Sequence, residues 1–181
     1  MRCVLLESLR MKKIIALTFL VLSQLVFAGP VADYTIQKGK LHTGGKARVE
    51  IIESSSEKFI VNLSYEIYKK ILVPIPDEDL KGESLFQLPS EFRDERGYLE
   101  LQTKGTMQIE EAKLHFVKRL KWNNLTDAYQ ILILPNNGRS KIEIIYHPSV
   151  KAAGWAKINI VFISKAPILN GYQVLIDLNE K

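Results

Sequence analysis

The stretch that decides the fold runs from Ala128 to Tyr146 and reads AYQILILP, then NNGRS, then KIEIIY. Its two β-prone runs are separated by Asn137-Gly138, a pair that tolerates the positive φ angles of a tight hairpin turn. Alternate residues of the second run, 142–146, give it one apolar face. The first run is apolar on both faces over residues 131–134, so we expect something to cover each side. A hairpin alone is marginal in water, and further strands must therefore flank this one.

Further strands are predicted on both sides of the hairpin. Residues 58–68 alternate most cleanly, with apolar side chains at every second position, which is typical of a half-buried strand. The remaining strand candidates are residues 33–37, 46–52, 98–103, 106–122 with a bend near 110–111, 155–164 and 172–178.

Two features of the chain refine this pattern. Within 106–122, Leu114, Phe116, Leu120 and Trp122 are expected to share a face that Lys118 interrupts. Residues 74–90 contain three prolines and are expected to form the longest irregular region, and no span shows a convincing amphipathic helix. The sequence thus predicts an all-β fold, an antiparallel, lipocalin-like β-barrel or a barrel-like sandwich of about eight to nine strands.

The N-terminus has the pattern of a secretory signal peptide. From Met11 two lysines precede a short apolar run, and small residues end it at Ala28. The apolar run is broken by polar residues and falls short of the roughly 20 residues that a membrane span needs. We therefore expect residues 1–28 to be a signal peptide cleaved after Ala28, with 1–10 an over-long start. Residues 29–181 would be a single all-β domain in a bacterial periplasm or secreted, without a membrane span.

Loss of the signal peptide changes the charge of the chain. Four basic residues and one acidic residue leave with it, so the formal net charge falls from +5 to +2. The main argument for nucleic-acid binding, a strongly basic net charge, then no longer applies. The single cysteine, Cys3, also leaves, so the mature chain would have no disulfide and no thiolate nucleophile.

The residues that carry chemistry are few and scattered. The three histidines, His42, His115 and His147, lie too far apart for a local metal motif, and no nucleophile elbow or phosphate loop accompanies them. We therefore predict a protein that is not an enzyme, with no catalytic residue, no metal site and no cofactor.

The interior of the barrel is the remaining candidate site. A barrel of this size either fills with side chains or holds one small apolar ligand, and sequence alone does not separate the two. Arg93 and Lys118 are candidates for the rim, where they would meet a polar head group. The candidate residues for an apolar ligand are Phe59, Val61, Leu63, Tyr65, Phe116, Tyr146, Ile160 and Phe162.

Several segments resemble one family. The run Phe92–Glu100, read as a charged segment before a Tyr-Leu-Glu strand, and the following Ile109–Leu114 are similar to the YceI-like periplasmic proteins. Residues 33–36 and 172–178 are similar to that family's first and last strands. The resemblance implies an extended lipocalin-like barrel that holds a polyisoprenoid or another lipid chain.

Two functions are consistent with these patterns. The first is binding of an apolar small molecule, a lipid or isoprenoid, inside the barrel. The second is a non-enzymatic β-sandwich that contacts another cell-envelope protein, which predicts a filled interior and an exposed apolar patch or open sheet edge.

Overall fold

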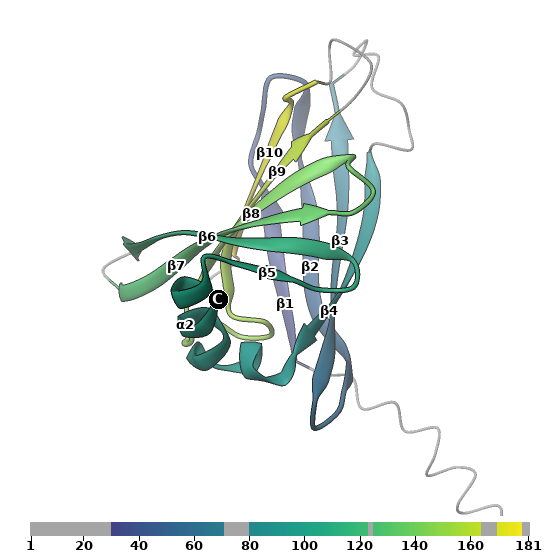
Figure 1. The fold of residues 1–181 in the computed structure, drawn as a ribbon. Helices are drawn as coiled ribbons and strands as arrows, with labels where there is room; N and C mark the ends of the chain where they lie inside the picture. The colour runs from purple at the N-terminus through teal and green to yellow at the C-terminus, as the bar shows by residue number, and fades with distance from the viewer. Residues whose placement is uncertain (1–29, 71–79, 123–124, 164–169, 179–181) are drawn as a thin grey trace, which may run out of the picture.

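Ten antiparallel strands form one sheet that curls into a half-barrel (Figure 1). The structure is a computed structural model that describes residues 30–70, 80–122, 125–163 and 170–178, so the predicted signal peptide lies outside the described residues. The strand order is β4-β3-β2-β1-β10-β9-β8-β7-β6-β5. The predicted all-β, barrel-like fold is confirmed. The strands are β1 (Val31–Ile36), β2 (His42–Ser54), β3 (Lys58–Lys69), β4 (Lys81–Pro89), β5 (Thr106–Gln108), β6 (Ala112–Trp122), β7 (Leu125–Pro135), β8 (Ser140–Tyr146), β9 (Trp155–Phe162) and β10 (Gln173–Leu178).

The predicted central hairpin is formed by β7 and β8, but its turn differs from the predicted one. Gly138 has a φ of 65° and its N–H donates to the Pro135 carbonyl over 3.0 Å, whereas Asn137 is not among the described residues with positive φ. A single left-handed residue is typical of the longer hairpin loops built on a type I turn. Of the doubly apolar arm, Ile131 and Ile133 are buried while Leu132 and Leu134 are only half-buried, so the sheet is covered mainly on its inner side.

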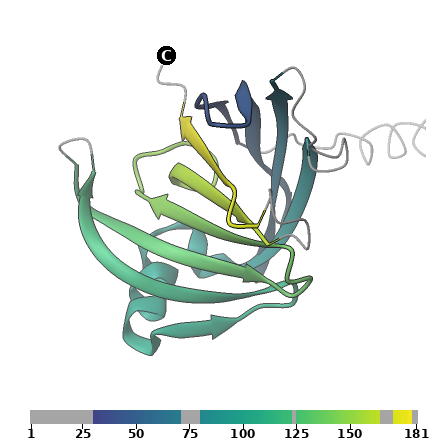
Figure 2. The same ribbon diagram turned by 90° about the horizontal axis from the view of Figure 1, so that it is seen from above.

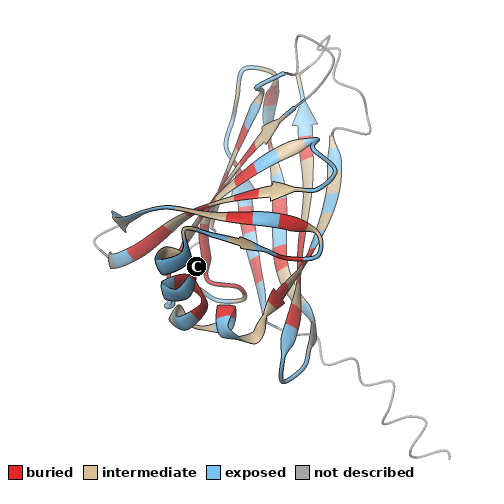
Figure 3. Cartoon of the chain, viewed as in Figure 1, coloured by how far each residue is buried: buried red, intermediate tan, exposed pale blue. Residues whose placement is uncertain are grey.

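The inner face of the sheet carries the core. Ile131, Ile144, Ile158 and Ile176 stand opposite one another across four consecutive strands, from β7 to β10. Buried and exposed residues alternate along most strands (Figure 3), as expected where one face is packed and the other faces water.

The half-barrel is open between its two edge strands, β4 and β5 (Figure 2). At this opening the Gln87 N–H of β4 donates to the Glu111 carboxylate over 3.0 Å, where a closed barrel would have strand pairing. The prediction of an irregular region over residues 74–90 was wrong for β4, which pairs with β3 from Glu66↔Lys81 to Lys58↔Pro89. Residues 71–79 lie outside the described residues.

The edge strands are joined through a helical segment instead of a strand pair. It comprises the 3₁₀-helix η2 (Ser90–Arg93) and the α-helix α2 (Glu95–Lys104), and we call residues 90–104 the helical lid. The prediction of a strand over residues 98–103 was therefore wrong, and the Tyr-Leu-Glu strand on which the family resemblance partly rested is a helix. The Asp94 side chain caps the helix by accepting from the Arg96 N–H, and Gly105 ends it with a φ of 75°.

Candidate functional site

The eight predicted interior residues lie together in one core. Five of them are buried and three are partly buried and packed against the same cluster. The buried ones are Phe59, Val61, Leu63, Tyr146 and Ile160, and the partly buried ones are Tyr65, Phe116 and Phe162. The core also contains Phe92, Tyr98 and Leu101 of the helical lid, which we did not predict. The i, i+3 spacing of Tyr98 and Leu101, between Asp94 and Gly105, was the sequence signal for these two residues but not for Phe92.

Aromatic rings attach the helical lid to the inner face of the sheet. The Tyr98 ring stacks on the Tyr146 ring with 3.5 Å between centroids and 13° between planes. The Phe92 ring meets the Tyr98 ring edge-on, with 4.9 Å between their centroids. Next to the lid, the rings of Phe86 in β4 and Trp155 in β9 lie 6.1 Å apart between centroids. The Tyr34 O–H donates to the Trp155 carbonyl, which joins β1 to β9 behind the rings. The lid therefore closes one end of the half-barrel through ring packing.

Polar contacts at the start of α2 add to this attachment. The Tyr129 O–H donates to the Glu95 carboxylate, and the Arg119 guanidinium lies 5.1 Å from the Tyr129 ring centroid. Arg119 also pairs with Asp127 at 3.0 Å and approaches Glu95 to 3.9 Å. The Arg119 and Glu95 side chains are about two-fifths exposed, so solvent screens their pairing and it contributes little to stability. The rings hold the lid more strongly than these charges do.

Beneath the lid, the described part of the interior is packed with side chains. One apolar hollow beneath the lid has a volume of about 10 Å³, enough for about one water-sized group. A lipid chain would therefore have to displace side chains that occupy the interior. The hollow is lined by Leu88, Phe92, Tyr98, Leu114, Ile131, Ile133, Ile144 and Trp155.

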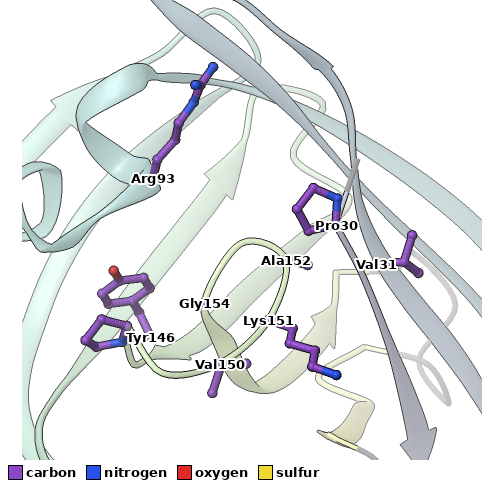
Figure 4. Close-up of a pocket in the computed structure, with 9 residues that line it drawn as sticks. Pro30, Val31, Arg93, Tyr146, Val150, Lys151, Ala152 and Gly154 are labelled. Carbon is purple, nitrogen blue, oxygen red and sulfur yellow. The ribbon is translucent and has the colours of Figure 1, made fainter. Parts of the chain in front are cut away.

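A larger cavity of about 340 Å³, which we call the rim cavity, opens beside the lid (Figure 4). Arg93 and Lys151 are the charged residues that line it, and the ring of Tyr146, on which the lid stacks, forms part of its wall. The Arg93 guanidinium donates to the Ser55 carbonyl over 2.6 Å and lies 5.5 Å from the Phe59 ring centroid, which fixes its position. The other lining residues are Pro30, Val31, Pro148, Val150, Ala152 and Gly154.

The close approach of the β8–β9 loop to Tyr146 requires glycine. Gly154 has a φ of 76°, and a Cβ there would lie 2.2 Å from the Tyr146 ring. The wall of the rim cavity and the packing of the lid thus depend on the same ring.

Lys118, the second predicted rim residue, does not line the rim cavity. The β6–β7 register shifts between Phe116 and Lys118, so Val117 is an extra residue that reverses the alternation. Lys118 pairs with Gln130, whose neighbour Ile131 faces the core, and therefore lies on the outer face. By the same alternation Leu120 and Trp122 lie on that outer face, so the prediction that they share a face with Leu114 was wrong.

The histidines occupy separate places. His42 is buried and its Nδ1 contacts the Tyr172 hydroxyl, while His147 Nδ1 lies 2.6 Å from the Ser149 hydroxyl. Burial lowers the pKa of His42, which favours the neutral ring. Among the described residues no group of three His, Cys, Asp or Glu side chains could hold a metal ion.

Burial of tyrosines makes the fold sensitive to alkali. Burial raises the pKa of Tyr172 from 10.0 to about 12, and raises that of Tyr129 to about 12 with help from Glu95. The unfolded chain releases these protons near pH 10, so we expect the contribution of the two tyrosines to stability to be constant below pH 10 and to be lost between pH 10 and about 12. Urea unfolding at fixed pH values would show it, and Tyr172→Phe should reduce the slope by up to about 1.4 kcal/mol per pH unit in this window. An unchanged slope in that variant would contradict the assignment.

Comparison with known proteins gives one structural likeness. No protein-family model matches the sequence, and no curated protein matches it. The chain is similar to a crystal structure described as an outer membrane lipoprotein-sorting protein domain from Vibrio parahaemolyticus, at 9% identity and a TM-score of 0.30, over 83% of each chain. Within the described residues no helix is long and apolar enough to cross a membrane.

Proposed function

We propose that this protein is an exported, non-enzymatic carrier of the bacterial periplasm or exterior that binds an apolar small molecule, a lipid or isoprenoid, in its half-barrel. The observation that carries the proposal is the way the apolar interior is closed. A helical lid held by ring packing covers it, and no strand pair joins β4 to β5. The lid can therefore move without breaking hydrogen bonds between strands.

An apolar ligand would take the place of the lid side chains. Moving Phe92, Tyr98 and Leu101 out of the core exposes apolar surface, at a cost of about 25 cal/mol per Å². A lipid chain that enters the same space removes its own apolar surface from water at a similar gain per Å². The exchange is nearly balanced, which suits a carrier that must also release its ligand.

The rim cavity supplies a place for the head group of such a ligand. Arg93 and Lys151 offer positive charge beside an otherwise largely apolar wall. Tyr146 belongs both to this wall and to the core, so a ligand beside it would have its head in the rim cavity and its chain in the interior. This arrangement favours an amphiphile with an acidic head group.

The experiment that tests the carrier is native mass spectrometry on residues 29–181 purified from a bacterial periplasm. We expect satellite peaks of constant added mass that are lost on activation and recovered in an organic extract. A peak for the bare protein that stays bare after incubation with a lipid mixture would overturn the proposal.

The rim cavity gives a separate prediction. Lys151→Glu should weaken binding of a fatty acid about tenfold, equivalent to 1.4 kcal/mol, and leave binding of the matching fatty alcohol unchanged. Lys141→Glu makes the same charge change at another exposed position and is the matched control. Competition with a fluorescent fatty acid measures both ligands. Equal effects of the two substitutions would show that the head group does not lie in the rim cavity.

A second function is favoured by the filled interior and the open sheet edge. The β4 edge has no second partner strand in the part of the chain that the structure describes, and Leu85 on it is 46% exposed. An envelope protein could add a strand there. If native mass spectrometry shows no ligand, capture of a partner from envelope extracts that Leu85→Pro prevents would support this alternative.

A further inference from the structure

The far end of the β6–β7 hairpin extends away from the body of the half-barrel in both views (Figures 1 and 2). We call residues 117–122 the hairpin tip; they read VKRLKW. The register shift between Phe116 and Lys118 reverses the alternation of the β6 residues that follow it, and a second shift, between Leu120 and Trp122, has its extra residue in β7. Lys118, Leu120 and Trp122 share the outer face, and Val117 at the first bulge is 47% exposed.

Two of the three basic side chains of the hairpin tip have no acidic partner in the part of the chain that the structure describes. Arg119 is paired with Asp127, but Lys118 and Lys121 are exposed and form no ion pair within the described residues. Two free ammonium groups therefore lie among Val117, Leu120 and Trp122, of which the last two are half-buried. Lysine, aliphatic and tryptophan side chains together match the interface of a bilayer that contains anionic lipids.

We infer that the hairpin tip is a docking surface for a membrane that contains anionic lipids. Lys118 and Lys121 meet the lipid phosphates, while Val117, Leu120 and Trp122 enter the boundary between head groups and acyl chains. Lys118 and Lys121 lie on opposite faces of β6, so the protruding hairpin meets the bilayer with both faces. Contacts of this size give weak, reversible and salt-sensitive attachment. The surface is independent of the apolar interior, so it functions whether or not the half-barrel carries a ligand.

Docking in this way also places the helical lid near the bilayer. Arg119, in the middle of the hairpin tip, reaches Glu95 at the start of α2, and Tyr129 donates to the same carboxylate. The tip and the first turn of the lid are therefore neighbours.

Vesicle binding tests the inference on the ligand-free mature chain. We expect residues 29–181 to sediment with phosphatidylglycerol-containing vesicles at low salt and much less with pure phosphatidylcholine vesicles. Brominated lipids should quench Trp122, and Trp122→Phe should remove most of that quenching because the other tryptophan, Trp155, is fully buried. Lys118→Gln with Lys121→Gln should weaken binding by tenfold or more.

A matched control separates the tip from the overall charge. Lys58→Gln with Lys141→Gln removes two exposed lysines elsewhere and should reduce binding far less. The inference is overturned if the protein does not sediment with the anionic vesicles, if it binds neutral vesicles equally well, or if the two double variants bind alike. Failure of the carrier function would leave these results unchanged, so the two proposals are tested separately.

Discussion

Tyr98→Ala is expected to lower the free energy of unfolding by about 3–5 kcal/mol, the range measured when a buried aromatic side chain is truncated to alanine. Tyr98 is 1% exposed, stacks on Tyr146 at 3.5 Å between centroids and contacts the edge of Phe92. Alanine keeps the helix propensity of α2 high, so the loss reports packing of the lid. Urea unfolding followed by circular dichroism measures the change.

The neighbouring residue supplies the control for this prediction. Leu99 lies on the same helix but is 43% exposed, and Leu99→Ala should change the free energy of unfolding by less than about 0.5 kcal/mol. Tyr98→Ala should also enlarge the hollow beneath the lid and increase uptake of an apolar fluorescent probe relative to Leu99→Ala. Equal stability of the two variants would contradict a lid held by ring packing.

The sheet could be predicted because its signal is local. Alternation over residues 58–68 places five side chains on one face, and the structure buries or half-buries all five there. The hairpin at Asn137-Gly138 was found for the same reason, although only Gly138 takes a positive φ. Register along these strands follows from the period of two, which needs no knowledge of distant residues.

The helical lid was missed because its two types of signal conflict. Tyr98, Leu99 and Leu101 read as strand residues, but Asp94 and Gly105 are helix boundary residues at helical spacing. The ring stack on Tyr146, 48 positions away, was not visible in the sequence, and this distant contact buries the helix face. Tertiary packing therefore overrides the local β propensity of this segment.

The placement of Lys118 and the filling of the interior could not be read from sequence for different reasons. A single bulge at Val117 reverses the faces of every later residue in β6, and no residue type marks it. Whether an apolar face lines a core or a pocket depends on how side-chain volumes add up across several strands and the lid. Identical alternation is compatible with both.

The second large effect is expected from locking the helical lid. The mature chain would contain no cysteine, so Glu95→Cys with Arg119→Cys introduces two unique thiols where the native side chains approach to 3.9 Å. Loss of the exposed ion pair should cost little, but the two substitutions also remove both partners of the Tyr129 hydroxyl, at a cost of about 1–3 kcal/mol, so each variant is compared with its own reduced form. A bismaleimide with a reducible disulfide in its spacer would join α2 to β6.

Linking these positions should slow uptake of an apolar ligand by at least about tenfold, which corresponds to a barrier raised by 1.4 kcal/mol, while reduction of the spacer restores it. The physical reason is that Phe92, Tyr98 and Leu101 cannot leave the core when the start of the helix is tied to the sheet. The Glu95→Cys single variant, which the reagent modifies at one end without forming a link, controls for the added mass. If the linked protein took up ligand as fast as the reduced one, the route would lie elsewhere, and the contact of Gln87 in β4 with Glu111, in the turn between β5 and β6, would be the next place to lock. Slow uptake that recovers on reduction would instead show that the lid controls when the half-barrel is open. The lid carries part of the core in its own side chains, so the core and the opening are then the same element.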